Sequence, residues 1–338
     1  MQSNITTDVT IIGAGPVGLF AVFELGMLKM KAHVVDALPS VGGQCTALYP
    51  EKPIYDIPGF PAIDAQELIN NLEKQAAPFH PTYHLGQQVT GCKKLENGNW
   101  LVTTSTGTVL ESKAVIIAAG CGAFGPNRPP MQGLETYEGT SVHYMVAKKD
   151  TFAGQTLVIA GGGDSAVDWA NSLAPIAKKV YVVHRRDKFR AMPESVAQMK
   201  ALEAAGKIEM VIPYQLDALE GDGKRLQAVV VSTMEGEKKS LPADHLLAFF
   251  GLSMDLGPIA NWGLNLHKNH IAVNPTTSET NEKGLFAIGD IATYENKLKL
   301  ILCGFSEAAF AAHSIYKIVH PDVELHFEYS TSKGVKVA

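Results

Sequence analysis

The chain has 338 residues, of which 46% are hydrophobic and 19% are charged, and its net charge is −5. This length and composition are typical of a folded protein with about two domains and exclude a disordered or fibrous chain. The acidic balance argues against a broad nucleic-acid surface. No apolar run approaches the roughly 18 residues that cross a membrane, and the polar segment before Val9 is unlike a signal peptide. We therefore expect a cytoplasmic protein that binds neither nucleic acid nor membrane.

Near the N-terminus, an apolar run over residues 9–12 leads into a GxGxxG pattern made by Gly13, Gly15 and Gly18. Helical apolar spacing follows over residues 19–28, so the glycines lie where a strand turns into a helix. In such a turn the first glycine permits the tight bend, the second lets the backbone approach a pyrophosphate, and the third lets the helix pack on the strand. The helix N-terminus then stabilises the phosphate charge.

The next predicted strand, over residues 31–36, ends in an acid. Asp36 follows Gly13 by 23 residues, a position from which a carboxylate can accept hydrogen bonds from both hydroxyls of an adenosine ribose. Strand, glycine pattern, helix and acid together predict a dinucleotide whose ribose carries no phosphate. FAD fits this description.

Further along the chain, residues 82–109 have the short strands and turns, such as Asn97–Gly98, of a β-meander. An apolar strand over residues 114–120 follows, and the glycines and prolines of residues 122–130 mark an outgoing linker.

The strand–turn–helix plan recurs after residues 155–160. Here Ala166 takes the place of the third glycine, because a small residue serves the same packing role. The motif residues that we expect at the second dinucleotide are Gly161, Gly163, Asp164, Ser165 and Ala166.

The strand that follows this second motif, over residues 179–183, ends in a basic cluster. His184 lies 23 residues after Gly161, and Arg185, Arg186 and Arg190 follow it. An acid at this place would repel a ribose 2′-phosphate, whereas arginines can pair with it in bidentate fashion. A solvated basic strand end is the alternative, but its coincidence with the ribose position favours NADPH.

A late apolar strand over residues 285–292 ends near Gly289–Asp290, and a helix is predicted over residues 306–319. This return to the first plan predicts a discontinuous FAD domain of residues 1–122 and 285–338. Residues 123–284 would form the inserted NADPH domain. Alternating strands and helices predict parallel sheets with helical cover, an α/β fold.

In their order and spacing, these motifs resemble those of the thioredoxin-reductase-like flavoproteins. The resemblance implies a pyridine nucleotide-disulfide oxidoreductase-like fold with two Rossmann-like, three-layer ββα domains. The chain departs from those reductases at their redox dithiol, because Tyr144 and Ala147 stand in the places of its two cysteines. The position five residues beyond Cys45, where lipoamide-dehydrogenase-type enzymes place a second cysteine, is Pro50. Disulfide reduction is therefore disfavoured, and neither a metal site nor a CxxC pair is written in the sequence.

The remaining branch, ferredoxin–NADP reductases of the thioredoxin-reductase type, resembles the chain in residues 42–52 and in the C-terminal segment 327–332. By this resemblance Tyr49 and Tyr329 stack on the two flavin faces. The complete set of expected FAD contacts is Gly13, Gly15, Gly18, Asp36, Gln44, Tyr49, Val89, Phe124, Asp290 and Thr331. Val89 in a meander strand has plain core packing as its alternative, and Asp290 a role as a helix N-cap. No side chain is expected as a catalytic acid or base.

The family implies an FAD-dependent enzyme that moves a hydride from NADPH to flavin N5 and then single electrons to ferredoxin, an iron–sulfur protein. One alternative is an NADPH-dependent reductase of another acceptor, namely a thiol-cofactor disulfide, flavodoxin or quinone. A non-catalytic flavin redox sensor is an alternative of another class.

A homodimer is also implied by the resemblance. A ferredoxin-docking face would be locally basic, and Lys297, Lys299, Lys333 and Lys336 are its candidates, although solvated surface lysines would explain them equally well.

Overall fold

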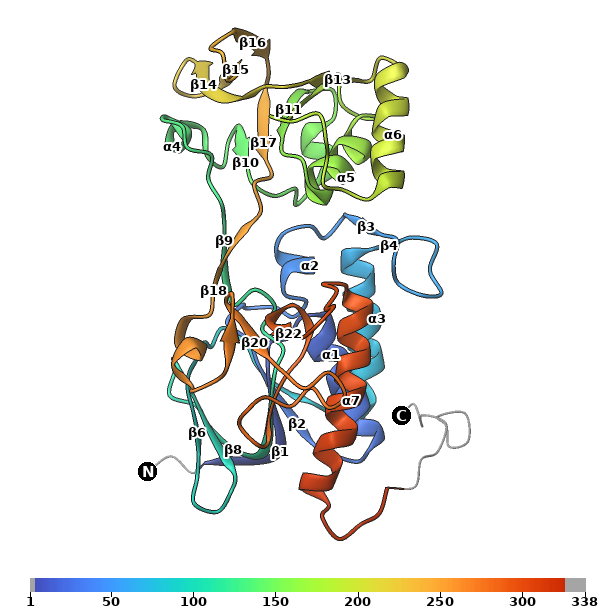
Figure 1. Ribbon diagram of the computed structural model, residues 1–338, viewed down its shortest axis with the longest axis vertical. Helices are drawn as coiled ribbons and strands as arrows, with labels where there is room; N and C mark the ends of the chain where they lie inside the picture. The colour runs from blue at the N-terminus through green and yellow to red at the C-terminus, as the bar shows by residue number, and fades with distance from the viewer. Residues whose placement is uncertain (1–3, 326–338) are drawn as a thin grey trace. The chain divides into compact units, whose positions relative to one another are not determined.

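The computed structural model describes residues 4–325, apart from the side chains of Ala123 and Phe124. The chain divides into two compact units (Figure 1). The first consists of Met1–Phe124 and Met254–Ala338, and the second of Gly125–Ser253. The two crossing segments, β9 (Ala123–Pro126) and β18 (Leu252–Asp255), pair with each other.

The main sheet of the first unit has the strand order β5-β2-β1-β8-β7-β6, and β21 also pairs with β8. Its strands are β1 (Ile5–Ile12), β2 (Ala32–Val35), β5 (Thr82–His84), β6 (Val89–Lys94), β7 (Trp100–Thr104), β8 (Val109–Ile117) and β21 (Leu285–Ala287). β5, β2, β1, β8 and β21 are parallel, whereas β6, β7 and β8 form an antiparallel meander. The predicted meander of residues 82–109 is therefore displaced, because β5 joins the parallel strands instead.

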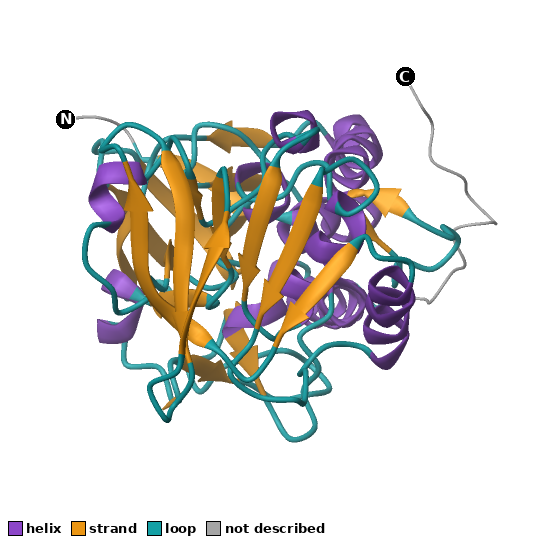
Figure 2. Ribbon diagram, turned by 90° about the horizontal axis from the view of Figure 1, so that it is seen from above, coloured by secondary structure: helices purple, strands orange, loops and turns teal. Residues whose placement is uncertain are grey.

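The parallel strands are apolar on both faces because each face packs against a different layer. Successive side chains of a strand point to opposite faces, and Ile11 and Val34 lie in one apolar core while Ile12 and Val35 lie in the other. The first core lies against helices, and the second lies against the meander, where it includes Trp100. This is the predicted three-layer ββα arrangement. Figure 2 colours the strands of the chain orange and its helices purple.

Helices α1 (Pro16–Met27), α3 (Ala65–Ala76) and α7 (Ile301–Val319) cover the first core, with α1 in contact with both others (Figure 1). Pro16 stands at the first helical position of α1, where a missing N–H leaves no hydrogen bond unmade. α7 begins at Ile301, earlier than the predicted residue 306. Its Gly304 allows close packing on α1, since a Cβ there would lie 2.4 Å from Cγ2 of Val17.

The first unit takes more of the chain than the predicted boundary at residue 284 allows. Residues 254–284 belong to it, because Leu256, Ile259 and Ile271 fill the core beside the meander. In this segment lie η3 (Gly257–Asn261), β19 (Leu266–His267) and β20 (His270–Ala272), and β20 pairs with β22 (Ala292–Thr293). These elements are too short to carry a periodic signal of which core they join. The outgoing crossing, predicted after residue 122, follows Phe124.

The second unit repeats the layered plan. Its parallel sheet has the order β10-β17-β11-β12-β13, with strands β10 (Val142–His143), β11 (Thr156–Ala160), β12 (Lys179–Val183), β13 (Ile208–Val211) and β17 (His245–Ala248). One face packs on an antiparallel sheet, β14 (Gln215–Gly221), β15 (Leu226–Ser232) and β16 (Lys238–Pro242). Helix α5 (Asp164–Leu173) contacts β11, β12 and helix α6 (Pro193–Ala204).

Two histidines meet at neighbouring strands of the second unit. Nε2 of His143 lies 3.1 Å from Nδ1 of His245, and the ring of Phe152 packs edge-on against both. Burial, together with the neighbouring His245, lowers the pKa of His143 to about 4, and burial lowers the pKa of His245. A proton on this pair therefore destabilises the folded unit.

The free energy of unfolding of the second unit should depend on pH for this reason. Between about pH 6.5 and pH 4 the unfolded chain binds protons that the folded chain does not. Stability should be complete above about pH 6.5 and should fall as the pH is lowered through this window. In urea unfolding, His143→Gln should flatten the pH dependence, whereas His267→Gln at an exposed position should leave it as in the wild type. An equally steep dependence in His143→Gln would contradict the assignment.

Candidate functional site

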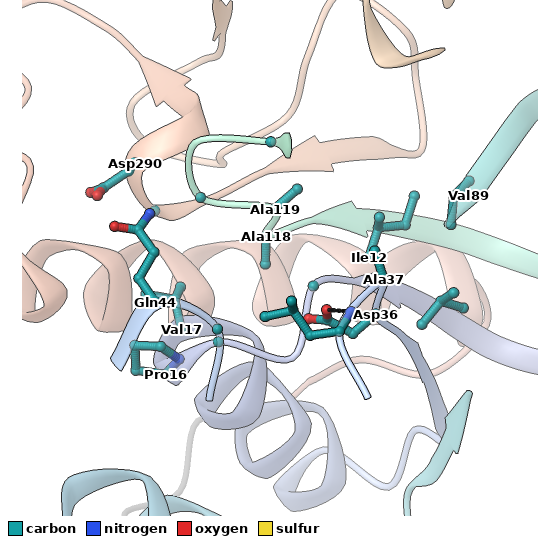
Figure 3. Close-up of a pocket in the computed structure, with 18 of the residues that line it drawn as sticks. Ile12, Pro16, Val17, Asp36, Ala37, Gln44, Val89, Ala118, Ala119 and Asp290 are labelled. Atoms are coloured by element: carbon teal, nitrogen blue, oxygen red, sulfur yellow. Dashed lines mark hydrogen bonds between the residues drawn. The ribbon is translucent and has the colours of Figure 1, made fainter. Parts of the chain in front are cut away.

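A pocket of about 420 Å³ lies in the first unit, at the carboxyl ends of its parallel strands. The ends of β1, β2 and β8, the N-terminus of α1, helix α2 (Gln44–Ala47) and the short helix η4 (Gly289–Ile291) contribute to its walls. In Figure 3, Asp36 and Val89 lie toward one end of the pocket and Gln44 and Asp290 toward the other. An elongated ligand can therefore contact both groups at once, as a dinucleotide would at this place in the fold.

The three glycines of the first motif do different work. A Cβ on Gly13, whose φ is +112°, would lie 2.3 Å from the carbonyl oxygen of Ala118, and one on Gly18 would lie 2.0 Å from the carbonyl oxygen of Gly13. A Cβ on Gly15 would meet nothing within 4 Å. Gly13 and Gly18 thus allow backbone and helix to approach, while Gly15 lines the pocket beside the N-terminus of α1. Gly18 does not itself line the pocket and acts behind it.

Asp36 is held in place at the end of β2. Its Oδ2 accepts a hydrogen bond from the N–H of Ala14 at 2.6 Å, and its Oδ1 accepts one from the N–H of Leu38 at 2.8 Å. Burial raises the pKa of Asp36, and the two backbone hydrogen bonds oppose that rise. Because an ionised carboxylate has about four acceptor positions, this side chain in the pocket wall keeps acceptor capacity for a ligand hydroxyl.

The opposite end of the pocket is built around α2. The N–H of Gly42 donates to the carbonyl of Ala14 at 2.8 Å, which holds the loop before α2 against the glycine turn. Gln44 and Tyr49 line the pocket together with Cys45, whose Sγ lies 4.0 Å from the Tyr49 hydroxyl. Burial raises the pKa of the Cys45 thiol to about 11, so this thiol stays protonated near neutral pH and is a poor nucleophile. All four cysteines are free.

The structure brings together seven of the predicted FAD contacts in the pocket wall: Gly13, Gly15, Asp36, Gln44, Tyr49, Val89 and Asp290. The Phe124 side chain, Tyr329 and Thr331 lie outside the described residues. Sequence reasoning missed other wall residues, namely Gln87, Gln88, Leu256, Pro258 and Ile259. The last three belong to residues 254–284, which the sequence predicts to lie in the other domain and which carry no nucleotide motif.

The prediction that Lys297 belongs to a docking surface is wrong. The side chain of Lys297 is only 5% exposed and forms an ion pair with Glu307, so it is not available on a surface. Lys299 is exposed, whereas Lys333 and Lys336 lie outside the described residues.

The second motif has the same division of roles. A Cβ on Gly161 would lie 2.9 Å from the Cβ of Ala166 and 2.6 Å from the carbonyl oxygen of Phe249, which explains why position 161 requires glycine. Gly163, at the N-terminus of α5, faces open space. Asp164 accepts a hydrogen bond from the N–H of Met192 at 2.9 Å, and Ser165 is exposed beside it.

The basic cluster lies next to this turn. The N–H of Arg190 donates to the carbonyl of Gly162 at 2.7 Å, and the His184 ring packs so closely that a Cβ on Gly162 would clash with it. These contacts bring residues 184–190 to the N-terminus of α5. Arg185, Arg186 and Arg190 are all exposed, so their guanidinium groups are accessible to an anion.

Tyr144, in the place of a dithiol cysteine, has its own hydrogen bond. Its hydroxyl donates to Oε1 of Glu138 at 2.6 Å, and Glu138 also pairs with Arg128.

Among residues 4–325, no helix has the length and apolar character needed to cross a membrane. Within the same range, no His, Cys, Asp and Glu side chains group as ligands for a metal ion.

Two layered units, each with an open glycine at a helix N-terminus, define a two-domain oxidoreductase class that binds two dinucleotides. The family described as Pyridine nucleotide-disulphide oxidoreductase matches residues 7–308, and the chain belongs to this family.

Relatives and solved structures agree with this assignment. A protein of Paramagnetospirillum magneticum named ferredoxin–NADP reductase is 61% identical over 97% of this chain and 98% of its own. One of the same name from Granulibacter bethesdensis is 59% identical over 98% of this chain and 95% of its own. The crystal structure of a Lactococcus lactis thioredoxin reductase has a TM-score of 0.80 and 26% identity, covering 93% of this chain and 99% of that one. The predicted fold is therefore confirmed.

Substitutions at Gly15 and Gly18 should separate ligand binding from packing. Gly15→Ala places a methyl group in open space at a φ of −72°. The gain from a stiffer unfolded chain is offset by the poor N-cap preference of alanine, so stability should change by less than about 1 kcal/mol while FAD affinity falls. Gly18→Ala should cost about 1–3 kcal/mol of unfolding free energy through overpacking. Urea unfolding of the apoprotein and FAD titration measure the two effects. Equal loss of stability in both variants would contradict the division of roles.

Proposed function

We propose that this protein is a ferredoxin–NADP reductase that uses FAD to transfer electrons between NADPH and ferredoxin. The observation that carries the proposal is the charge contrast between its two nucleotide units. One ends in the partly buried carboxylate of Asp36, and the other ends in exposed Arg185, Arg186 and Arg190. The names of its relatives support the same activity.

In the first unit, Asp36 would accept hydrogen bonds from the adenosine ribose, and Gly15 would leave room for the pyrophosphate. Gln44 and Asp290 lie toward the other end of the pocket, and Tyr49 also lines its wall, so the flavin ring would lie at this end. When bound, FAD supplies the exchange between a two-electron hydride donor and a one-electron carrier. The chain contributes binding and orientation, and we assign no acid or base to it.

In the second unit, the arginines would pair with the 2′-phosphate of NADPH, and the N-terminus of α5 would face the pyrophosphate. Gly163 leaves that approach open. The remaining motif residues, Asp164 and Ser165, are exposed at the same helix end.

The acceptor is inferred from the thiols. Cys45 is protonated and beside the Tyr49 hydroxyl, and Tyr144 replaces a cysteine at the usual dithiol. An outer-sphere electron acceptor needs only access to the flavin edge, whereas a disulfide substrate needs a thiolate. This favours ferredoxin over a thiol-cofactor disulfide. A cytoplasmic homodimer completes the proposal, and light scattering of the purified chain tests the dimer.

The acceptor is tested by steady-state NADPH oxidation with purified ferredoxin and, in parallel, with a thioredoxin or low-molecular-weight disulfide. Ferredoxin should be reduced rapidly and the disulfides only at the background rate. Cys45→Ser should retain ferredoxin reduction, like the matched variant Cys303→Ser. Turnover of a disulfide that Cys45→Ser abolishes would overturn the proposal. Flavin reduction by NADPH without turnover of any acceptor would favour a sensor.

The arginine cluster should determine the choice between NADPH and NADH. A hydrogen bond to a charged group contributes about 1.5–3 kcal/mol, so Arg185→Ala combined with Arg186→Ala should raise KM for NADPH at least about tenfold. KM for NADH should change little, because NADH has no 2′-phosphate. Arg225→Ala, at an exposed turn of the same unit, is the control and should retain the wild-type preference. Parallel loss with both nucleotides would contradict the 2′-phosphate assignment.

A further inference from the structure

A buried carboxylate on α7 accepts hydrogen bonds from three donors of a single short segment. Glu307 is 2% exposed, and its Oε2 accepts a hydrogen bond from the N–H of Gly289 at 2.7 Å. Its Oε1 accepts one from the Tyr294 hydroxyl at 2.7 Å and pairs with the ammonium of Lys297. All three donors belong to the stretch that follows β21, so one side chain fixes that stretch to the helix.

The stretch held in this way forms part of the pocket wall. Gly289 and Asp290 line the pocket, and Gly289 has a φ of +75°, which favours glycine. Its Cα lies close to Gly304 of α7 and to Val17 of α1. The N–H of Gly289 is used by Glu307, so the direction in which the next side chain, Asp290, enters the pocket depends on that hydrogen bond.

Lys297 adds a buried positive charge to the same group. Its ammonium lies 5.4 Å from the centre of the Tyr294 ring, and its side chain is 5% exposed. Burial raises the pKa of Asp290, and the charge of Lys297 is the largest influence that opposes the rise. The pair with Glu307 is electrically balanced, and Asp290 remains the negative group that faces the pocket.

Buried ion pairs of this kind are seldom a source of net stability, because desolvation offsets the attraction between the charges. Breaking one is costly, since it leaves a buried charge without a partner. The pair of Glu307 and Lys297 adds little net stability, but it fixes the Gly289–Asp290 turn and the charge beside the pocket. A role in positioning that turn explains the pair better than a role in stabilising the fold.

We propose that Glu307 and Lys297 are a positioning pair that directs Asp290 toward the flavin and sets the electrostatic field at that end of the pocket. The inference rests on the assignment of FAD to this pocket. It predicts that the pair controls both FAD affinity and the flavin midpoint potential. Neither residue contacts the ligand in this account, and both act through the Gly289–Asp290 turn.

The test compares Glu307→Gln with the double variant Glu307→Gln/Lys297→Met. Glutamine can still accept from the N–H of Gly289 but leaves the charge of Lys297 unbalanced, and this field favours the more negative, reduced flavin. Glu307→Gln should therefore raise the midpoint potential. Because the amide nitrogen of glutamine cannot accept a hydrogen bond from the Tyr294 hydroxyl, the turn should also be held less firmly, and the FAD dissociation constant should rise at least about tenfold. The double variant removes both charges together, so its potential should return toward that of the wild type. Glu295→Gln, at an exposed position of the same segment, is the matched control and should behave as the wild type.

The outcomes are distinct. A wild-type protein that binds no FAD would overturn the proposed function itself. Wild-type FAD binding with an unchanged potential in Glu307→Gln, or a double variant shifted as far as Glu307→Gln, would overturn the positioning pair alone. Urea unfolding of each apoprotein checks that the variants fold. A loss of affinity without any shift in potential would assign Glu307 a purely structural role and reject its electrostatic one.

Discussion

The close approach of α1 to β1 is the constraint on which the first unit depends. It is possible because Gly18 has no side chain, and a Cβ there would lie 2.0 Å from the carbonyl oxygen of Gly13. This contact fixes the N-terminus of α1 at the carboxyl end of the parallel strands, where its dipole and free N–H groups favour a phosphate. In the second unit the corresponding close contact is between Gly161 and Ala166. A Cβ on Gly161 would lie 2.9 Å from the Cβ of Ala166, so the turn and the helix approach closely there as well.

The two units use this shared geometry for ligands of different charge. Asp36 is partly buried, and two backbone N–H donors hold its carboxylate at the strand end. The arginines of the second unit are exposed. Their guanidinium groups remain solvated in the absence of a ligand, so they need no protein partner to offset desolvation. In both units a charged strand end follows the first glycine by 23 residues, but its charge is negative in the first unit and positive in the second.

Local patterns were enough to predict the parts of the fold that repeat a known plan. Strand β12 has its predicted bounds, and the pocket wall contains the predicted Asp36, Gln44 and Tyr49. Long-range packing decided the rest. Residues such as Leu256 and Ile259 joined the first core because their sequence has no period that distinguishes one core from another. Lys297 resembled a surface lysine, since its partner Glu307 lies on a helix that the sequence alone does not place beside it.

The same distinction applies to the redox chemistry. Cys45 stands after a glycine pair, as a redox cysteine does in some relatives of the fold, but its neighbour in space is the Tyr49 hydroxyl and its thiol is protonated. We therefore infer that FAD is the redox group between NADPH and the acceptor. Anaerobic titration of the flavin-loaded protein with NADPH tests this claim most directly, by counting the electrons that the protein takes up. We predict that uptake ends at two electrons per flavin, with no change in the number of free thiols. Uptake of two further electrons, with the appearance of two new thiols, would contradict the account.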